Sequence, residues 1–282
     1  MTAAAKTPVV KGMPQVRQRH PVRGVLAAIG EGTIDLLRPL IGLSSLAVAV
    51  LWQSCRPLNW RRTSVKEFMR QCDLVGIGSL PFVLLSGLLV GLAMVFQILF
   101  WLNFLGQLSL AGKIIVLGLV REIAPLLVAL IAIGRSGSVN MVELGHMRTS
   151  GQLRMLEAQG IDPFLFLIVP RCLATALSMF CLTVVFILVS LATGYMVGII
   201  ILHSDATVVD YINNVLNAMG VGEYVIIALK PLIAGMLITL ITCITGLSVG
   251  GSAGQLAEAL PRGFVKSVLA VLLVSGTLTL LF

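Results

Sequence analysis

Residues 74–104 read LVGIGSLPFVLLSGLLVGLAMVFQILFWLNF, a stretch that contains no Asp, Glu, Lys or Arg. An α-helix rises about 1.5 Å per residue, so roughly 20 apolar residues are enough to cross the hydrocarbon core of a bilayer. A stretch this long and this apolar has lipid, rather than water, as its solvent. It therefore predicts a membrane-spanning helix.

The composition of the whole chain agrees with that prediction. Of its 282 residues, 57% are hydrophobic and 11% are charged, whereas a water-soluble domain carries about a quarter charged residues. Five cysteines are scattered without a C-x-x-C pair, and four of them lie in or beside apolar segments. We expect free thiols that pack as small apolar groups, and neither a metal site nor a disulfide framework.

Four further apolar segments follow the first, so we expect an all-α polytopic fold with five transmembrane helices. The predicted spans cover residues 74–104, 113–133, 164–202, 224–249 and 264–282. Before them, the tail at 1–22 is polar and basic, is no secretory signal, and is expected to be disordered. Residues 23–73 are expected to form an interfacial amphipathic helix at about 25–52 and a polar cytoplasmic connection at 56–73, which leaves 74–282 as the membrane domain.

The positive charges predict the orientation. Eleven of the 20 Lys and Arg residues lie in the first 70 positions, which places the N-terminus in the cytoplasm by the positive-inside rule. Five spans then put the C-terminus on the opposite side and the connections at 134–163 and 250–263 inside. The segment 203–223, which has no Lys or Arg, faces outward. A nucleic-acid-binding arm would need a soluble domain beside it, so we expect no nucleic-acid partner.

Two charged residues lie where charge is costly. Arg121 and Glu122 fall near the middle of the second span, where each charge costs roughly 2.5–3.5 kcal/mol on insertion scales. Neighbours on a helix point about 100° apart, so each residue needs another partner or water. Lys230 in the fourth span is the candidate partner of Glu122. The three residues either hold the helices together as a buried ion network or line a cavity for a charged headgroup; Pro125 and Pro231 are predicted to kink the helices beside them.

The same region carries a family resemblance. The motifs are Arg121-Glu-Ile-Ala-Pro125, Gly134-Arg-Ser-Gly-Ser138, Glu143-Leu-Gly-His-Met-Arg148, Gln152, Leu156-Glu157, Gly160-Ile-Asp-Pro163 and Pro170-Arg171. In these residues the chain resembles the MlaE family, the permeases of ABC systems for intermembrane lipid transport. The resemblance departs at Gly151 and Ser275, where the family usually has acidic residues at or beside the aligned positions.

The resemblance implies a homodimer in the bacterial inner membrane. Its substrate would be a phospholipid or similar amphiphile, held between the protomers in a cavity whose charged residues are Arg121, Glu122 and Lys230. The implied partners are a cytoplasmic ABC ATPase, a lipid-binding protein with an MCE domain and, in some systems, a small STAS-domain protein. ATP would be bound by the ATPase, so this chain would need no cofactor and would not be an enzyme.

The cytoplasmic loop at 134–163 is where such a permease would receive force. The chain has no G-x-x-x-x-G-K-[ST] phosphate loop, so a separate subunit must hydrolyse ATP. The resemblance makes Ser138–Gly160 a coupling helix, with Leu144, Met147, Met155 and Leu156 on its apolar side and Glu143, Arg148 and Glu157 on its exposed side. The residues expected to couple to the ATPase are Ser138, Glu143, Met147, Arg148, Gln152 and Glu157.

Two other classes of protein are less compatible with the sequence. An intramembrane serine protease could use the G-x-S-x-G patterns at 246–250 and 250–254, but no strand precedes them and no histidine lies inside a span. An ion-coupled secondary transporter could use Glu122 as its ion site. The absence of a visible inverted repeat and the long polar loop at 134–163 count against it.

Overall fold

The structure is a computed structural model that describes residues 49–50, 52–53, 62–107, 110–202, 208–249 and 253–281. These residues are almost entirely helical and contain no β-strand, which confirms the all-α prediction. The predicted tail at 1–22 and nearly all of the predicted interfacial helix at 25–52 lie outside the described residues.

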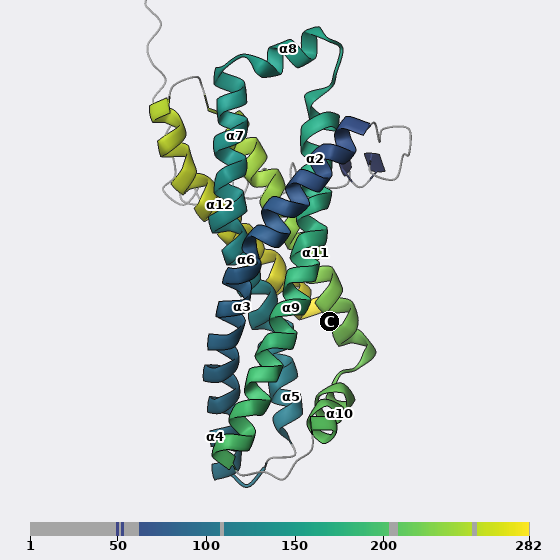
Figure 1. The fold of residues 1–282 in the computed structure, drawn as a ribbon, viewed down its shortest axis with the longest axis vertical. Coiled ribbons are helices and arrows are strands. Elements are labelled where there is room, and N and C mark those ends of the chain that lie inside the picture. Colours follow the sequence, from purple (N-terminus) through teal and green to yellow (C-terminus); the bar gives the residue numbers. More distant parts are fainter. Residues whose placement is uncertain are drawn as a thin grey trace, which may run out of the picture. The chain divides into compact units, whose positions relative to one another are not determined.

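Short π-helical segments (η) join several α-helices into longer continuous helices (Figure 1). The elements are α2 Arg62–Cys72, η2 Asp73–Ile77, α3 Gly78–Val90, η3 Gly91–Val95, α4 Phe96–Phe104, α5 Ala111–Ile115, η5 Val116–Ile123, α6 Ala124–Ala132, η6 Ile133–Gly137, α7 Ser138–Thr149, α8 Gln152–Ala158, η7 Phe164–Ile168, α9 Val169–Leu202, α10 Val208–Ala218, α11 Val221–Leu247 and α12 Ala253–Leu281.

Within the part of the chain that the structure describes, five helical stretches are long and apolar enough to cross a membrane, so the chain is a multi-pass membrane protein, as predicted. Their mean hydropathies lie between 2.0 and 2.6, and they are Ser64–Phe104, Ala111–Thr149, Phe164–Ile199, Gly222–Leu247 and Gly254–Leu281.

The helices extend beyond the apolar segments, and here the sequence interpretation was wrong in three places. The polar connection expected at 56–73 is helical from Arg62, and the loop expected at 250–263 is helical from Ala253. The second span continues as α7 to Thr149, so a single coupling helix over Ser138–Gly160 is replaced by α7 and α8. Gly151, at φ +73°, separates them, because this left-handed conformation favours glycine and cannot continue a helix.

The two prolines lie in different helical contexts. Pro125 follows the π-helical segment η5 and occupies the first turn of α6, where a residue without an N–H costs least. Pro231 lies inside α11, which runs without interruption from Val221 to Leu247. The π-helical turns before Pro125 are a recognised cause of local helix distortion.

Helix α9 packs beside α2, α3, η3 and α11 (Figure 1). Glycines allow close approach at two of these contacts, α9 with η3 and α9 with α11. A Cβ atom at Gly194 would lie 2.6 Å from a methyl group of Val95, and one at Gly235 would lie 2.7 Å from Cα of Ala176. Small residues at such crossings let helix backbones approach closely in lipid, where apolar burial does not drive association.

Two clusters of buried apolar side chains fill the interior. One contains Val120, Val128, Phe186 and Ile238 and lies between the spans, and the other surrounds Leu144 and Cys172, where α7 meets α9 and α11.

Candidate functional site

Lys230 is the centre of a charged cluster between three spans. Its ammonium group donates to Oε1 of Glu122 at 2.8 Å, to the hydroxyl of Thr279 at 2.8 Å and to the backbone carbonyl of Arg121 at 3.0 Å. An ammonium group has three N–H donors, and all three are used. The predicted pairing of Lys230 with Glu122 is present, and it joins η5, α11 and α12.

The other members of the cluster complete the same arrangement. Thr279 donates its hydroxyl to Oε1 of Glu122 at 2.6 Å, and Arg121 donates from Nη2 to the backbone carbonyl of Thr279 at 2.9 Å. The side chain of Lys230 is 3% exposed, whereas that of Glu122 is 33% exposed. Lys230 therefore holds the helices together from inside, while Glu122 reaches the surface of this single chain.

Sequence reasoning missed Thr279, because a threonine near the end of an apolar segment carries no distinctive pattern. Ser275, one helical turn earlier on α12, is buried and its hydroxyl has no partner among the described residues. The neutral hydroxyl of Thr279 bridges Glu122 and Lys230 without adding a charge to the three already present.

An apolar cavity adjoins the charged cluster. It has a volume of about 330 Å³, lies between the second span and α12, and is lined by Ile123, Leu126, Leu127, Leu130, Ile133, Val268, Val271 and Leu272. Leu126 and Val271 also line a small hollow that contains Lys230 and Ser275. An apolar cavity beside a cluster of charged side chains can accommodate an amphiphilic molecule, with its apolar part in the cavity and its polar part at the cluster.

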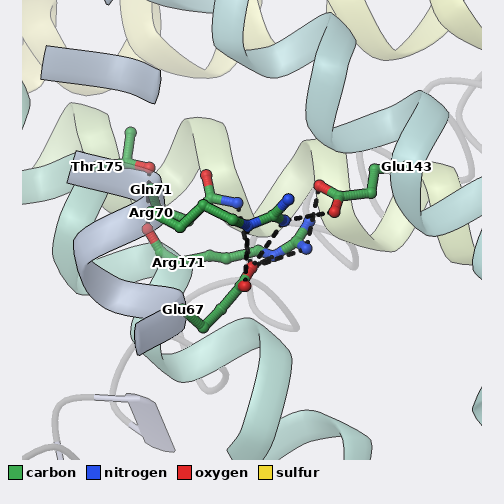
Figure 2. Close-up of polar contacts among 6 residues, drawn as sticks. All are labelled: Glu67, Arg70, Gln71, Glu143, Arg171 and Thr175. Atoms are coloured by element: carbon green, nitrogen blue, oxygen red, sulfur yellow. Dashed lines mark hydrogen bonds and ion pairs between the residues drawn. The ribbon is translucent and has the colours of Figure 1, made fainter. Parts of the chain in front are cut away.

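A second charged group joins α2, α7 and α9, and Figure 2 shows its two arginines lying between two carboxylates. Nη2 of Arg171 lies 2.9 Å from Oε1 of Glu67 and 3.1 Å from Oε2 of Glu143. Arg70 is paired with the same two carboxylates, at 3.1 Å from Glu67 and in a short contact with Glu143. We call these four residues the arginine–glutamate network.

Burial makes the arginine–glutamate network costly to disrupt. The side chain of Arg171 has no exposed surface, and Gln71 beside it donates to Oε1 of Glu67 at 3.2 Å. A charge buried this deeply persists only because it is paired, and removing a partner from such a pair commonly costs about 3–5 kcal/mol. The network therefore connects α7 to α2 and α9 through buried and half-buried ion pairs.

The network corrects the expected orientation of Glu143. Sequence reasoning placed it on the exposed side of the coupling helix, but its carboxylate points inward because Arg171 and Arg70 lie there (Figure 2). Met155, expected on the apolar side, is 63% exposed.

The remaining coupling residues lie nearer their expected places. Leu144 is buried and Met147 is half-buried, while Arg148, Gln152 and Glu157 are exposed. Ser138 donates its hydroxyl to the carbonyl of Gly134 at 2.8 Å, within its own helix.

Sequence reasoning did not find Glu67 or assign a role to Arg70 and Arg171. A usable signal was present, because Glu67, Arg70 and Gln71 are spaced i, i+3 and i+4 and so share one helix face. That spacing was overlooked because the segment was interpreted as a connection rather than as a helix.

Five long apolar helices among the described residues define a multi-pass membrane protein, and Lys230 and Glu122 form an ion pair between its helices. Residues 68–281 match the family described as permease MlaE. The chain belongs to this family of ABC transporter permeases and is therefore a transport subunit.

Individual relatives agree with the family. A probable ABC transporter permease of Synechocystis is 30% identical over 210 residues, which cover 74% of this chain and 79% of that protein. The intermembrane phospholipid transport system permease protein MlaE of Haemophilus influenzae is 32% identical over 175 residues, or 62% and 65% of the two chains. The chloroplast protein TRIGALACTOSYLDIACYLGLYCEROL 1 of Arabidopsis thaliana is 28% identical over 229 residues, or 80% and 62%.

Proposed function

We propose that this chain moves a phospholipid, or a similar amphiphile, between the bacterial inner membrane and a periplasmic MCE-domain carrier protein, driven by a separate ATPase. The observation that carries the proposal is the apolar cavity beside the charged cluster. The name of the Haemophilus relative, an intermembrane phospholipid transport permease, supports the same class of substrate.

The charge balance of the cluster suits a phospholipid headgroup. Lys230 neutralises Glu122, which leaves the positive charge of Arg121 without a carboxylate among the described residues. Nε of Arg121 also has no hydrogen-bond partner among them. A phosphodiester carries one negative charge and accepts hydrogen bonds from a guanidinium group, so it would complete the cluster. In this proposal Arg121 contacts the headgroup and Lys230 positions Glu122.

We place the cavity between two copies of the chain. Only 22% of the apolar window of α12 is buried within one copy, and α12 forms one wall of the cavity. A second copy would close the open side and shield the acyl chains. The N-terminus is cytoplasmic and the C-terminus periplasmic in this arrangement.

Helices α7 and α8 are proposed to receive force from the ATPase. Their exposed residues Arg148, Gln152 and Glu157 can contact a partner, while Glu143 connects α7 to α2 and α9 through the arginine–glutamate network. A displacement of α7 would then move the spans. A small STAS-domain protein would be a further cytoplasmic partner.

Purification followed by reconstitution tests the proposal. The detergent-solubilised chain should co-purify with an ATPase and an MCE-domain protein, and liposomes containing the complex should transfer fluorescent phospholipid to or from the MCE protein only with ATP and Mg²⁺. Transfer driven by a proton or sodium gradient without any ATPase would overturn the proposal in favour of a secondary transporter. A complex that hydrolyses ATP without moving lipid would exclude the proposed substrate.

A further inference from the structure

Helix α10, Val208–Ala218, connects the third and fourth spans and presents three distinct faces. One face packs on the protein: Val215 is buried, and the ring of Tyr211 lies 5.5 Å from the ring of Tyr195 on α9. The backbone of Asn214 touches α5, since a Cβ atom at Gly112 would lie 2.7 Å from its carbonyl oxygen.

The other two faces of α10 are both exposed but differ in chemistry. Val209, Ile212 and Leu216 are 60%, 48% and 46% exposed. Their spacing of three and four residues places them in one stripe along the helix. Asn213 and Asn217 are also exposed and, at about 100° per residue, lie beside the stripe on the side away from the packing face. The helix is therefore divided into protein-facing, apolar exposed and polar exposed sectors.

The depth of α10 follows from its contacts. Tyr195 lies about two turns before the end of α9 at Leu202, and Gly112 is the second residue of α5. Helix α10 thus packs against the sides of the spans near their ends rather than beyond them. Exposed aromatic residues, Trp101 and Phe104 on α4 and Tyr224 on α11, lie at the same end of the bundle. Such residues mark the interface between bilayer and water.

We infer that α10 is an interfacial helix that lies in the plane of the bilayer surface, with Val209, Ile212 and Leu216 inserted into the acyl region and the asparagines in the headgroup layer. The three sectors are those that a helix needs at the junction of protein, lipid and water. Exposed apolar side chains are also present on the two spans that α10 connects, at Met196 on α9 and Val225 on α11.

The bilayer is favoured over a protein partner because α10 packs against membrane-spanning helices, and exposed apolar and aromatic side chains lie at the same end of these helices. A soluble partner would need to cover a stripe on a helix that packs against the sides of membrane spans. The inference is independent of the proposed transport function, because it depends only on the chain spanning a membrane.

Spin labelling of the full chain in liposomes of phosphatidylethanolamine and phosphatidylglycerol tests the inference. Single cysteines are introduced as Ile212→Cys and Leu216→Cys, with Asn213→Cys and Asn217→Cys as matched controls on the same helix. The native cysteines are replaced by Ala, and the cysteine-free chain serves as the labelling blank. Power saturation then compares relaxation of each nitroxide by oxygen, which concentrates in lipid, with relaxation by a water-soluble nickel chelate.

Labels at 212 and 216 should be relaxed more by oxygen than by the nickel chelate, and labels at 213 and 217 should show the reverse. Equal access of nickel at 212 and 213 would mean that the stripe faces water. Low access of both reagents at 212 and 216 would mean that protein covers it, with spin–spin broadening in the case of a second copy. Either result would overturn the inference. If the cysteine-free chain does not fold, labelling is repeated with buried Cys172 and Cys243 retained.

Discussion

Nη2 of Arg171, near the start of α9, lies 3.1 Å from Oε2 of Glu143, in the middle of α7. The contact links α9, in the third span, to α7, which continues the helix of the second span to Thr149. Because Arg171 is fully buried, moving α7 away from α9 would remove one of its two carboxylate partners and leave only Glu67. Glu143 therefore connects α7 to α2 and α9 through ion pairs and does not belong to the exposed surface of α7.

Glu143→Gln should destabilise the protein, because it removes one of two carboxylates from a buried arginine. Arg171 keeps Glu67, so we expect about 1–3 kcal/mol, below the cost of losing an only partner. Thermal unfolding in detergent measures the change. Glu157→Gln, at an exposed position on α8, is the control and should unfold at the wild-type temperature; equal midpoints for the two variants would contradict a structural role for the network.

Arg148→Glu should weaken binding of the proposed ATPase and lower the stability of the chain by no more than about 1 kcal/mol. Arg148 is exposed in the last turn of α7, so reversing its charge changes the surface offered to a partner and adds only a small unfavourable interaction with the helix dipole. Co-purification yield and thermal unfolding, measured on the same preparation, separate the two effects. Lys266→Glu, an exposed charge reversal on α12, should retain the ATPase. Undiminished recovery of the ATPase with Arg148→Glu would exclude this surface.

Thr279→Val should lower stability by about 1–2 kcal/mol, because valine has the shape of threonine but lacks the hydroxyl that bridges Glu122 and Lys230. Thr277→Val, two residues earlier on α12, is the matched control, since its exposed hydroxyl bonds only to the carbonyl of Val274 in its own helix. The measurement is again the unfolding midpoint. A larger loss in the control would mean that the bridge contributes nothing.

Arg121→Gln should reduce phospholipid transfer at least tenfold without dissociating the complex, because it removes the uncompensated positive charge of the cluster. Lipid that co-purifies with the chain, quantified by mass spectrometry, should fall in parallel. Lys113→Gln, an exposed residue on α5, should transfer lipid at the wild-type rate. Wild-type transfer by Arg121→Gln would remove the headgroup contact from the proposal.

Gly235→Ala should destabilise the contact between α9 and α11 by about 1–3 kcal/mol, because the added methyl group would meet the backbone of Ala176 at 2.7 Å. Gly222→Ala lies on the same helix in open space and should be neutral or slightly stabilising. Unfolding midpoints of the two variants, compared side by side, distinguish close packing from a general intolerance of alanine in α11.

Much of the architecture was predictable because the free energy of transferring a helix from water into lipid is close to the sum of the contributions of its individual residues. An uncharged run such as 74–104 identifies a span wherever it lies in the fold, and five runs define a five-span membrane protein. The pairing of Glu122 with Lys230 was also predictable, because charges inside spans are rare and leave few possible partners.

Helix ends and the remaining polar partners depended on three-dimensional contacts. Polar residues continue a helix past its apolar segment when another helix satisfies them, as Arg171 does for Glu67 and Glu143. No local pattern could indicate that positions 67, 143 and 171, or 122 and 279, lie within hydrogen-bond distance. Hydrophobicity is a property of each side chain, but the pairing of charges depends on distances between segments that only the packed helices establish.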